Sequence, residues 1–186
     1  FVVQLGNGSD ITAEDHHCSP LGEHSLQVGT WTRAVAAALP LPQDLRDAEE
    51  QAGLHHDDGK TDPLFQRSIQ ASGEAGSPAM AKSRRRMTRP QYLALCANDG
   101  YRHGWRHEVA SADVEDDLVA HLIVSHHGHG RGLIVHTDDE AAQLGDARIT
   151  SHAAVFDGLN DTYGPWGLAF LEFVLKYADR RASAHP

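Results

Sequence analysis

Histidines and aspartates gather in a few short stretches of this sequence, at spacings that suit metal binding. The densest stretch is HHDDGK at residues 55–60. His56 and Asp57, adjacent at the end of an expected helix, offer an imidazole nitrogen and a carboxylate oxygen to one cation. Gly59 then allows a turn that no Cβ obstructs. The alternative interpretation of the same residues is a polar helix end that is simply solvated.

A second stretch, SHHGHGR at residues 125–131, closes the most apolar segment of the chain. His126 and His127 directly follow this segment, where a pair of imidazoles without partners would be costly. Metal coordination removes that cost, whereas hydrogen bonds to the backbone explain one of the two histidines more easily than both. His129 is expected to lie in the following loop, outside a metal cluster.

A third stretch, RHGWRHE at residues 102–108, adds His107. His103 lies four residues earlier and would share a helical face with it, although Gly104 weakens the expectation of a helix there. The stretch does not form an HExxH motif, because Ser111 stands where the second histidine would be. A zincin-type peptidase is therefore disfavoured.

Two single residues lie on apolar helical faces. His24 is in register with Val28, and Asp179 continues a stripe that includes Leu171 and Leu175. A lone inward-facing histidine is more often an ordinary core residue than a ligand. A buried carboxylate, however, needs a partner, and a metal ion is a strong one. Taken with the three stretches, both residues fit one shared metal cluster.

Residues 59–61 (GKT) look like the end of a phosphate-binding loop, but the rest of that motif is missing. The motif needs a glycine five residues before Gly59, and Leu54 occupies that position. The two aspartates before Gly59 would also repel a triphosphate. We therefore reject a nucleotide-binding P-loop.

The elements that must position these residues are helices. The apolar periodicity and the proline and glycine positions predict helices over residues 22–39, 43–55, 63–69, 90–96, 114–127 and 166–182. Residues 1–20 are expected to form an arm or loop, and residues 71–89 a mobile basic loop. The strand-like fragments are Val2-Val3 and Ile134-Val135. The sequence thus predicts an all-α fold, a single globular helical bundle over residues 21–186 with no second domain.

The bulk composition bounds the function. A chain of 186 residues with 40% apolar content suits one core, and His121 interrupts the longest apolar run well short of a membrane span. Cys18 and Cys96 form no CxxC motif, so we expect a reducing cytoplasm. The net charge of −10 disfavours non-specific coating of duplex DNA. A local basic run can still guide a strand or be only a solvated face; it comprises Lys82, Arg84, Arg85, Arg86 and Arg89.

The ordered series LGEHS, HDDGK, WRHE, SHHGHGR and ADRRAS spans nearly the whole chain, from Leu21 to Ser183. It resembles the HD superfamily of metal-dependent phosphohydrolases, and more closely the HD nuclease domain of the CRISPR type I interference helicase–nuclease. The resemblance implies one metal ion held by His24, His56, Asp57 and Asp179. It implies a second ion held by His107, His126 and His127, with Asp57 bridging. Asp57 and Lys60 would be the catalytic residues, with Lys60 facing the scissile phosphate.

The activity implied by the resemblance is endo- or exonucleolytic cutting of single-stranded DNA in CRISPR antiviral interference. Its partners would be an attached or associated helicase and a CRISPR surveillance complex, with no membrane. Five histidines and two aspartates suit Mn, Fe, Co, Ni or Zn better than Mg. Two interpretations stay open beside it. One is an HD phosphohydrolase acting on nucleotides or other small phosphoesters; the other is a non-catalytic metal-binding or docking module.

Overall fold

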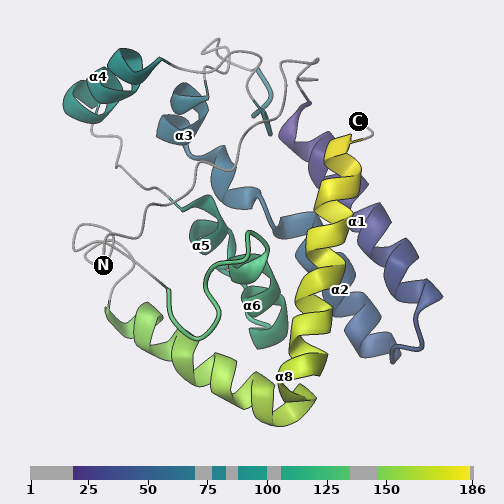
Figure 1. Ribbon diagram of the computed structural model, residues 1–186. Helices are drawn as coiled ribbons and strands as arrows, with labels where there is room; N and C mark the ends of the chain where they lie inside the picture. The colour runs from purple at the N-terminus through teal and green to yellow at the C-terminus, as the bar shows by residue number, and fades with distance from the viewer. Residues whose placement is uncertain (1–18, 70–76, 83–87, 100–105, 135–145, 185–186) are drawn as a thin grey trace.

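Helices make up most of the computed structural model, which describes residues 19–69, 77–82, 88–99, 106–134 and 146–184 (Figure 1). In chain order they are α1 (Leu21–Ala38), α2 (Gln43–His55), the 3₁₀ helix η1 (Asp58–Thr61), α3 (Pro63–Ser68), α4 (Arg89–Asp99), α5 (His107–Ser111), α6 (Asp117–Ser125) and α8 (Asp146–Ala184). Extended pairing within these ranges is limited to an isolated bridge between Pro20 and Met80. The predicted all-α fold is confirmed.

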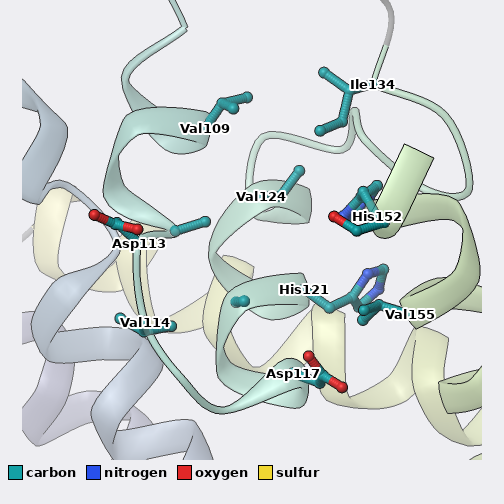
Figure 2. Close-up of a pocket in the computed structure, with 12 residues that line it drawn as sticks. Val109, Asp113, Val114, Asp117, His121, Val124, Ile134, His152 and Val155 are labelled. Atoms are coloured by element: carbon teal, nitrogen blue, oxygen red, sulfur yellow. The ribbon is translucent and has the colours of Figure 1, made fainter. Parts of the chain in front are cut away.

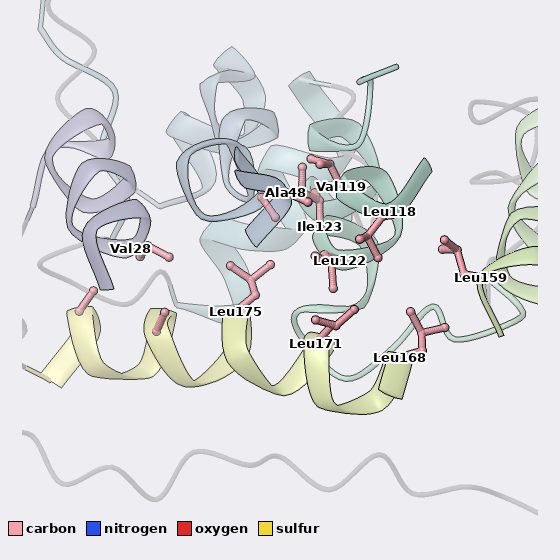
Figure 3. Close-up of a cluster of buried hydrophobic side chains, with 13 residues drawn as sticks. Val28, Ala48, Leu118, Val119, Leu122, Ile123, Leu159, Leu168, Leu171 and Leu175 are labelled. Atoms are coloured by element: carbon pink, nitrogen blue, oxygen red, sulfur yellow. The ribbon is translucent and has the colours of Figure 1, made fainter. Parts of the chain in front are cut away.

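The core forms where the second half of α8 packs against α6 (Figure 3). Leu168 and Leu175 of α8 and Leu122 and Ile123 of α6 are fully buried, and their burial is a main source of stability. α1 and α2 pack on each other and on α8. The core therefore holds the C-terminal ends of α2 and α6 close to the C-terminal half of α8.

Helices α1 and α2 approach each other closely because glycines lie at their contact. A Cβ on Gly53 would lie 2.5 Å from Thr32 Oγ1 and 3.0 Å from Gly29 Cα, which is too close for real atoms. The two backbones can therefore meet only without a side chain at this point. The approach places His24 beside His56, with ring centroids 5.5 Å apart.

The described helices differ from the sequence prediction in α4, which continues to Asp99, in α5 (His107–Ser111), which was not predicted, and in α6 and α8. α6 begins at Asp117, later than predicted, because the Asp116 side chain accepts a hydrogen bond from Val119 N (2.9 Å) and caps the helix. α8 begins at Asp146, and the stretch before residue 166 was not predicted as helix. Gly164, with φ of 70°, and Pro165 form a kink between the two parts, which is why the periodicity of the second part alone stood out.

Several sequence predictions fall outside the described residues. These include the N-terminal arm, most of the basic loop and the position of His103, which all remain predictions. Arg89, assigned to that loop, is instead the first residue of α4. Among the described helices, none has the length and apolar character needed to cross a membrane.

Candidate metal centre

All seven predicted metal ligands are described, and the structure brings them together from five parts of the chain. His24 comes from α1, His56 and Asp57 from the link between α2 and η1, His107 from the first residue of α5, His126 and His127 from the residues after α6, and Asp179 from the end of α8. They form three overlapping groups of three residues, and within each group the ligand atoms lie within 4.8 Å of one another. The structure thus gathers all seven residues into a cluster that could hold a metal ion, and their role as ligands stays a prediction.

Asp57 occupies the middle of the cluster and is 1% exposed. Its Oδ2 lies 3.3 Å from His56 Nε2 and 3.7 Å from His24 Nε2. Its Oδ1 lies 3.1 Å from His107 Nε2 and 3.9 Å from His126 Nε2. The two oxygens of one carboxylate therefore face two different sets of imidazoles, as a bridging ligand requires.

The remaining ligands complete each side. Asp179 Oδ1 lies 3.2 Å from His24 Nε2 and 3.9 Å from His56 Nε2. On the other side, His127 Nε2 lies 3.0 Å from His107 Nε2. Two imidazole nitrogens at that distance are held together either by one shared proton or by a cation bound to both. His127 is the solvent-facing member of its group.

Three buried polar atoms in the cluster lack hydrogen-bond partners in the structure: His56 Nε2, Asp57 Oδ1 and His126 Nε2. The other ring nitrogens explain their orientation. His56 Nδ1 donates to Gly53 O (2.9 Å), and His126 Nδ1 donates to Ile123 O (2.6 Å). In the neutral imidazole each Nε2 then carries a lone pair aimed into the cluster, which is the arrangement of metal-binding histidines. Orphaned buried acceptors are costly, so this donor set fits a metal ion.

The protonation states agree with a ligand role. Burial opposes ionisation of Asp57, but the charge of His56, the polar contact with the His107 ring and the charge of Lys60 outweigh it and hold the pKa of Asp57 well below its usual value. Burial lowers the pKa of His126, as do the neighbouring imidazoles of His127 and His56. The carboxylate is thus ionised and the imidazole neutral near pH 7, the forms that bind metal.

Asp179 and His56 complete the electrostatic picture. Burial acts against ionisation of Asp179, but the hydrogen bond from His24 and the charge of His56 lower its pKa well below normal. Burial would lower the pKa of His56, but the charges of Asp57 and Asp179 reverse this and raise it. The two carboxylates thus favour a proton on His56, in the place that a divalent cation would take.

Gly59 joins the two sides of the centre. A Cβ there would overlap the carbonyl oxygen of His107 and lie 2.9 Å from Ala110 Cβ. Gly59 N donates to Ser111 Oγ (2.8 Å), and that hydroxyl donates to His107 O (2.8 Å). The missing side chain lets η1 pack directly on α5, which brings Asp57 to His107.

Lys60 lies beside the cluster. Its Nζ is 2.6 Å from Asp57 Oδ2, and its side chain is 12% exposed. The Lys60 carbonyl accepts a hydrogen bond from Gln66 Nε2 (2.6 Å). The backbone of this lysine is thus fixed, while its ammonium group lies at the carboxylate that would bridge two cations.

Other histidines in the motifs lie outside the cluster. His55 Nδ1 pairs with Asp58 Oδ2 at 2.8 Å, and both side chains are about half exposed (44% and 54%). His129 is exposed and belongs to none of the candidate ligand groups, as predicted. His55 therefore does not compete as a ligand.

Sequence reasoning did not assign Glu108 a role. Glu108 is buried, and its Oε1 accepts from Arg106 Nε at 2.6 Å, while its Oε2 lies 3.8 Å from His107 Nδ1. The Arg106 charge outweighs burial and lowers the pKa of Glu108. This carboxylate can orient the His107 ring from behind. The only sequence signal for it was its place directly after His107.

A separate cavity of about 190 Å³ lies between α5, α6 and the first part of α8 (Figure 2). Val109, Val124 and Ile134 line it together with His121 and His152. His121 is fully buried, but its Nε2 pairs with Glu172 Oε1 at 2.9 Å. None of the seven metal-ligand residues lines this cavity, so it is not part of the metal centre.

No protein-family model, curated protein or solved structure matches this chain. The resemblance to HD nucleases therefore stays a prediction that rests on the motifs themselves. What the geometry establishes is a buried cluster of imidazoles and carboxylates that can hold a metal ion.

Proposed function

We propose that this chain is a metal-dependent phosphodiesterase that cuts single-stranded DNA, working with a helicase in CRISPR antiviral interference. The observation that carries the proposal is the position of Asp57. Its two oxygens face His24 and His56 on one side and His107 and His126 on the other. This arrangement supports two divalent transition-metal ions sharing one carboxylate.

Different residues would have different roles in an in-line phosphodiester hydrolysis. Bound in the cluster, two cations would lower the pKa of a water molecule and stabilise negative charge on the phosphate. Asp57 would hold both cations, and the backbone bonds of His56 and His126 fix the imidazoles that would bind them. Once Asp57 is engaged by cations, the Lys60 ammonium is positioned to stabilise the phosphate oxygens as charge develops.

Access to the centre supports a strand as substrate. The Asp179 side chain is 21% exposed, and His127 lies at the surface. Both sides of the cluster therefore reach solvent, where a flexible single strand can present a phosphate. The motif series adds support for a nuclease over a nucleotide hydrolase. The alternative, hydrolysis of nucleotides or other small phosphoesters, uses the same centre and differs in substrate alone.

Neighbouring histidines provide the sharpest test of the centre. We expect His56→Ala to lose bound metal and at least 100-fold in DNA cleavage, on the order of the effect of removing one catalytic charge stabiliser. His55→Ala should keep both, because His55 points to Asp58 outside the cluster. Metal analysis and a nuclease assay on the two variants decide the matter. Equal activity in both variants would refute the metal centre.

A substrate comparison separates the remaining functions. Metal-stripped protein is refilled with Mn²⁺, Ni²⁺, Zn²⁺ or Mg²⁺ and offered circular single-stranded DNA or deoxynucleoside triphosphates. Cleavage of the DNA circle with a transition metal supports the nuclease. Hydrolysis of triphosphates with intact DNA favours the small-substrate enzyme. Metal binding without hydrolysis of either would indicate a structural metal site.

A further inference from the structure

A short segment that ends at Lys82 is held against the start of α1. Leu21 N donates to Ala79 O (2.7 Å), and Ala81 N donates to Ser19 O (3.0 Å). These two bonds flank the bridge between residues 20 and 80. Ala81 is 4% exposed, so the segment is packed into the protein. Lys82 is therefore presented from a fixed backbone close to the helix that carries His24.

One side chain ties this segment to Lys60. Gln66 Oε1 accepts from Met80 N (2.8 Å), and its Nε2 donates to Met80 O (3.0 Å) and to Lys60 O (2.6 Å). The amide thus satisfies both backbone groups of Met80 and also fixes the carbonyl of Lys60. Because a single planar group makes all three bonds, the two lysine-bearing segments keep a defined relative position.

The Lys82 side chain reaches the electrostatic field of the metal centre. Partial burial lowers its pKa, the charges of Asp179 and Asp57 raise it, and the charge of Lys60 lowers it. Two ammonium groups and two carboxylates therefore share one region. Cations bound at the carboxylates would add their positive charge to that of the two lysines. The region then favours an anion.

We propose that Lys82 is a second phosphate-binding residue of the metal centre, contacting the same phosphodiester group as Lys60. The inference rests on the proposed function, since it assigns a residue to that substrate. The charges that act on Lys82 are those of Asp179, Lys60 and Asp57, and Lys60 Nζ lies at the oxygen of Asp57 that faces His56. Two ammonium groups on a fixed frame bind a phosphate more tightly than one. The pair also selects substrates that carry a phosphate over neutral esters.

The decisive measurement is the affinity of Mn²⁺-loaded protein for inorganic phosphate, by calorimetry. We expect Lys82→Ala to weaken phosphate binding by roughly 10-fold or more, the usual scale for a charged hydrogen bond, and Lys82→Arg to restore most of it. Arg33→Ala is the control. It removes one positive charge from the exposed face of α1, where the side chain is 64% exposed and paired with Glu50. This variant should bind phosphate normally.

A structural role for Lys82 makes the opposite prediction for metal binding. If the ammonium group serves phosphate, its removal should leave Mn²⁺ affinity equal or higher, because a like charge beside the cations is lost. If it only holds the fold together, Lys82→Ala should lower Mn²⁺ affinity and leave phosphate affinity unchanged. The second pattern, or unchanged values for both, overturns the proposal.

Activity provides a third readout. With single-stranded DNA and with bis(p-nitrophenyl) phosphate, Lys82→Ala should lower kcat/KM to a similar degree, because both substrates present one phosphodiester to the centre. A loss confined to DNA would place Lys82 on a distant part of the strand and refute its contact with the reacting phosphate. Should the Mn²⁺-loaded wild type cleave neither substrate, the proposed function fails. The phosphate affinities still decide the role of Lys82.

Discussion

At the scale of single residues, Asp57 differs from every other ligand because it faces both sides of the cluster. The proposed two-ion arrangement therefore predicts distinct metal stoichiometries. Asp57→Asn should lower the occupancy of both metal ions. Asp179→Asn should lower the occupancy of the first ion only, and His127→Ala that of the second only. Titration of Mn²⁺ into metal-free protein, followed by elemental analysis, measures this. Identical losses in the three variants would contradict a bridging role.

Glu49 gives a second prediction at this scale. Its side chain on α2 is fully buried, and neither carboxyl oxygen has a hydrogen-bond partner in the structure. Burial raises the pKa of Glu49 to about 9. The folded protein therefore holds the carboxyl protonated at neutral pH, while the unfolded chain ionises it above its ordinary value near 4.5. The contribution of Glu49 to the free energy of unfolding is fully present below pH 4.5 and is lost as the pH rises towards 9.

Replacing Glu49 with Gln should remove this loss. One pKa unit corresponds to about 1.4 kcal/mol, so Glu49→Gln should stabilise the metal-free protein by roughly 2–4 kcal/mol at pH 8 and have little effect near pH 5. Urea denaturation of both proteins at several pH values checks this. The same difference at pH 5 and pH 8 would show that Glu49 does not titrate on unfolding.

At the scale of elements, glycines decide how closely the ligand-bearing helices approach. Gly53→Ala should destabilise the protein by roughly 1–3 kcal/mol, since its Cβ would meet Thr32 and Gly29 and push α1 away from α2. The same change at Gly158 meets no atom within 4 Å and should stabilise α8 by roughly 0.5–1 kcal/mol. Chemical denaturation measures both. Similar effects at the two positions would show that the contact is looser than described.

The elements also show how far the sequence could predict this structure. Pro40, Pro63 and the apolar periodicity gave α1, α2 and α3 almost to the residue, because local signals set those ends. The first part of α8 was missed, and so was α5, which is only five residues long. Short or polar helices depend on packing that one local window does not contain.

The sequence likewise predicted some residues of the candidate site and missed others. Six of the seven candidate ligands could be named because each is a polar side chain at an expected helix end or on an apolar face, and His107 was named from the motif resemblance. The positions of Glu108 and Lys82 could not be predicted from the sequence. Glu108 Oε2 lies 3.8 Å from His107 Nδ1, and the segment that ends at Lys82 is held by backbone bonds to Ser19 and Leu21. Such long-range contacts follow from the fold and leave no periodic pattern in the sequence.

At the scale of the whole molecule, the candidate metal centre joins helices of the core to α5, which lies outside the main core cluster. Its candidate ligands come from α1, α5 and α8 and from the residues that follow α2 and α6. Without cations, the cluster leaves buried acceptors without partners and carboxylates close together. Metal binding should therefore be a substantial part of the stability of the folded chain.

We accordingly expect removal of metal by a chelator to lower the free energy of unfolding, and refilling to restore it. A ligand that binds only the folded state adds about 2.7 kcal/mol when present at 100 times its Kd, and two ions should add more than one. Thermal and urea denaturation of stripped, Mn²⁺-loaded and Asp57→Asn protein measure the effect. The variant should respond least, because it has lost the shared ligand. If the stripped and loaded wild type unfold at the same midpoint, the cluster does not bind Mn²⁺ in the folded state under those conditions.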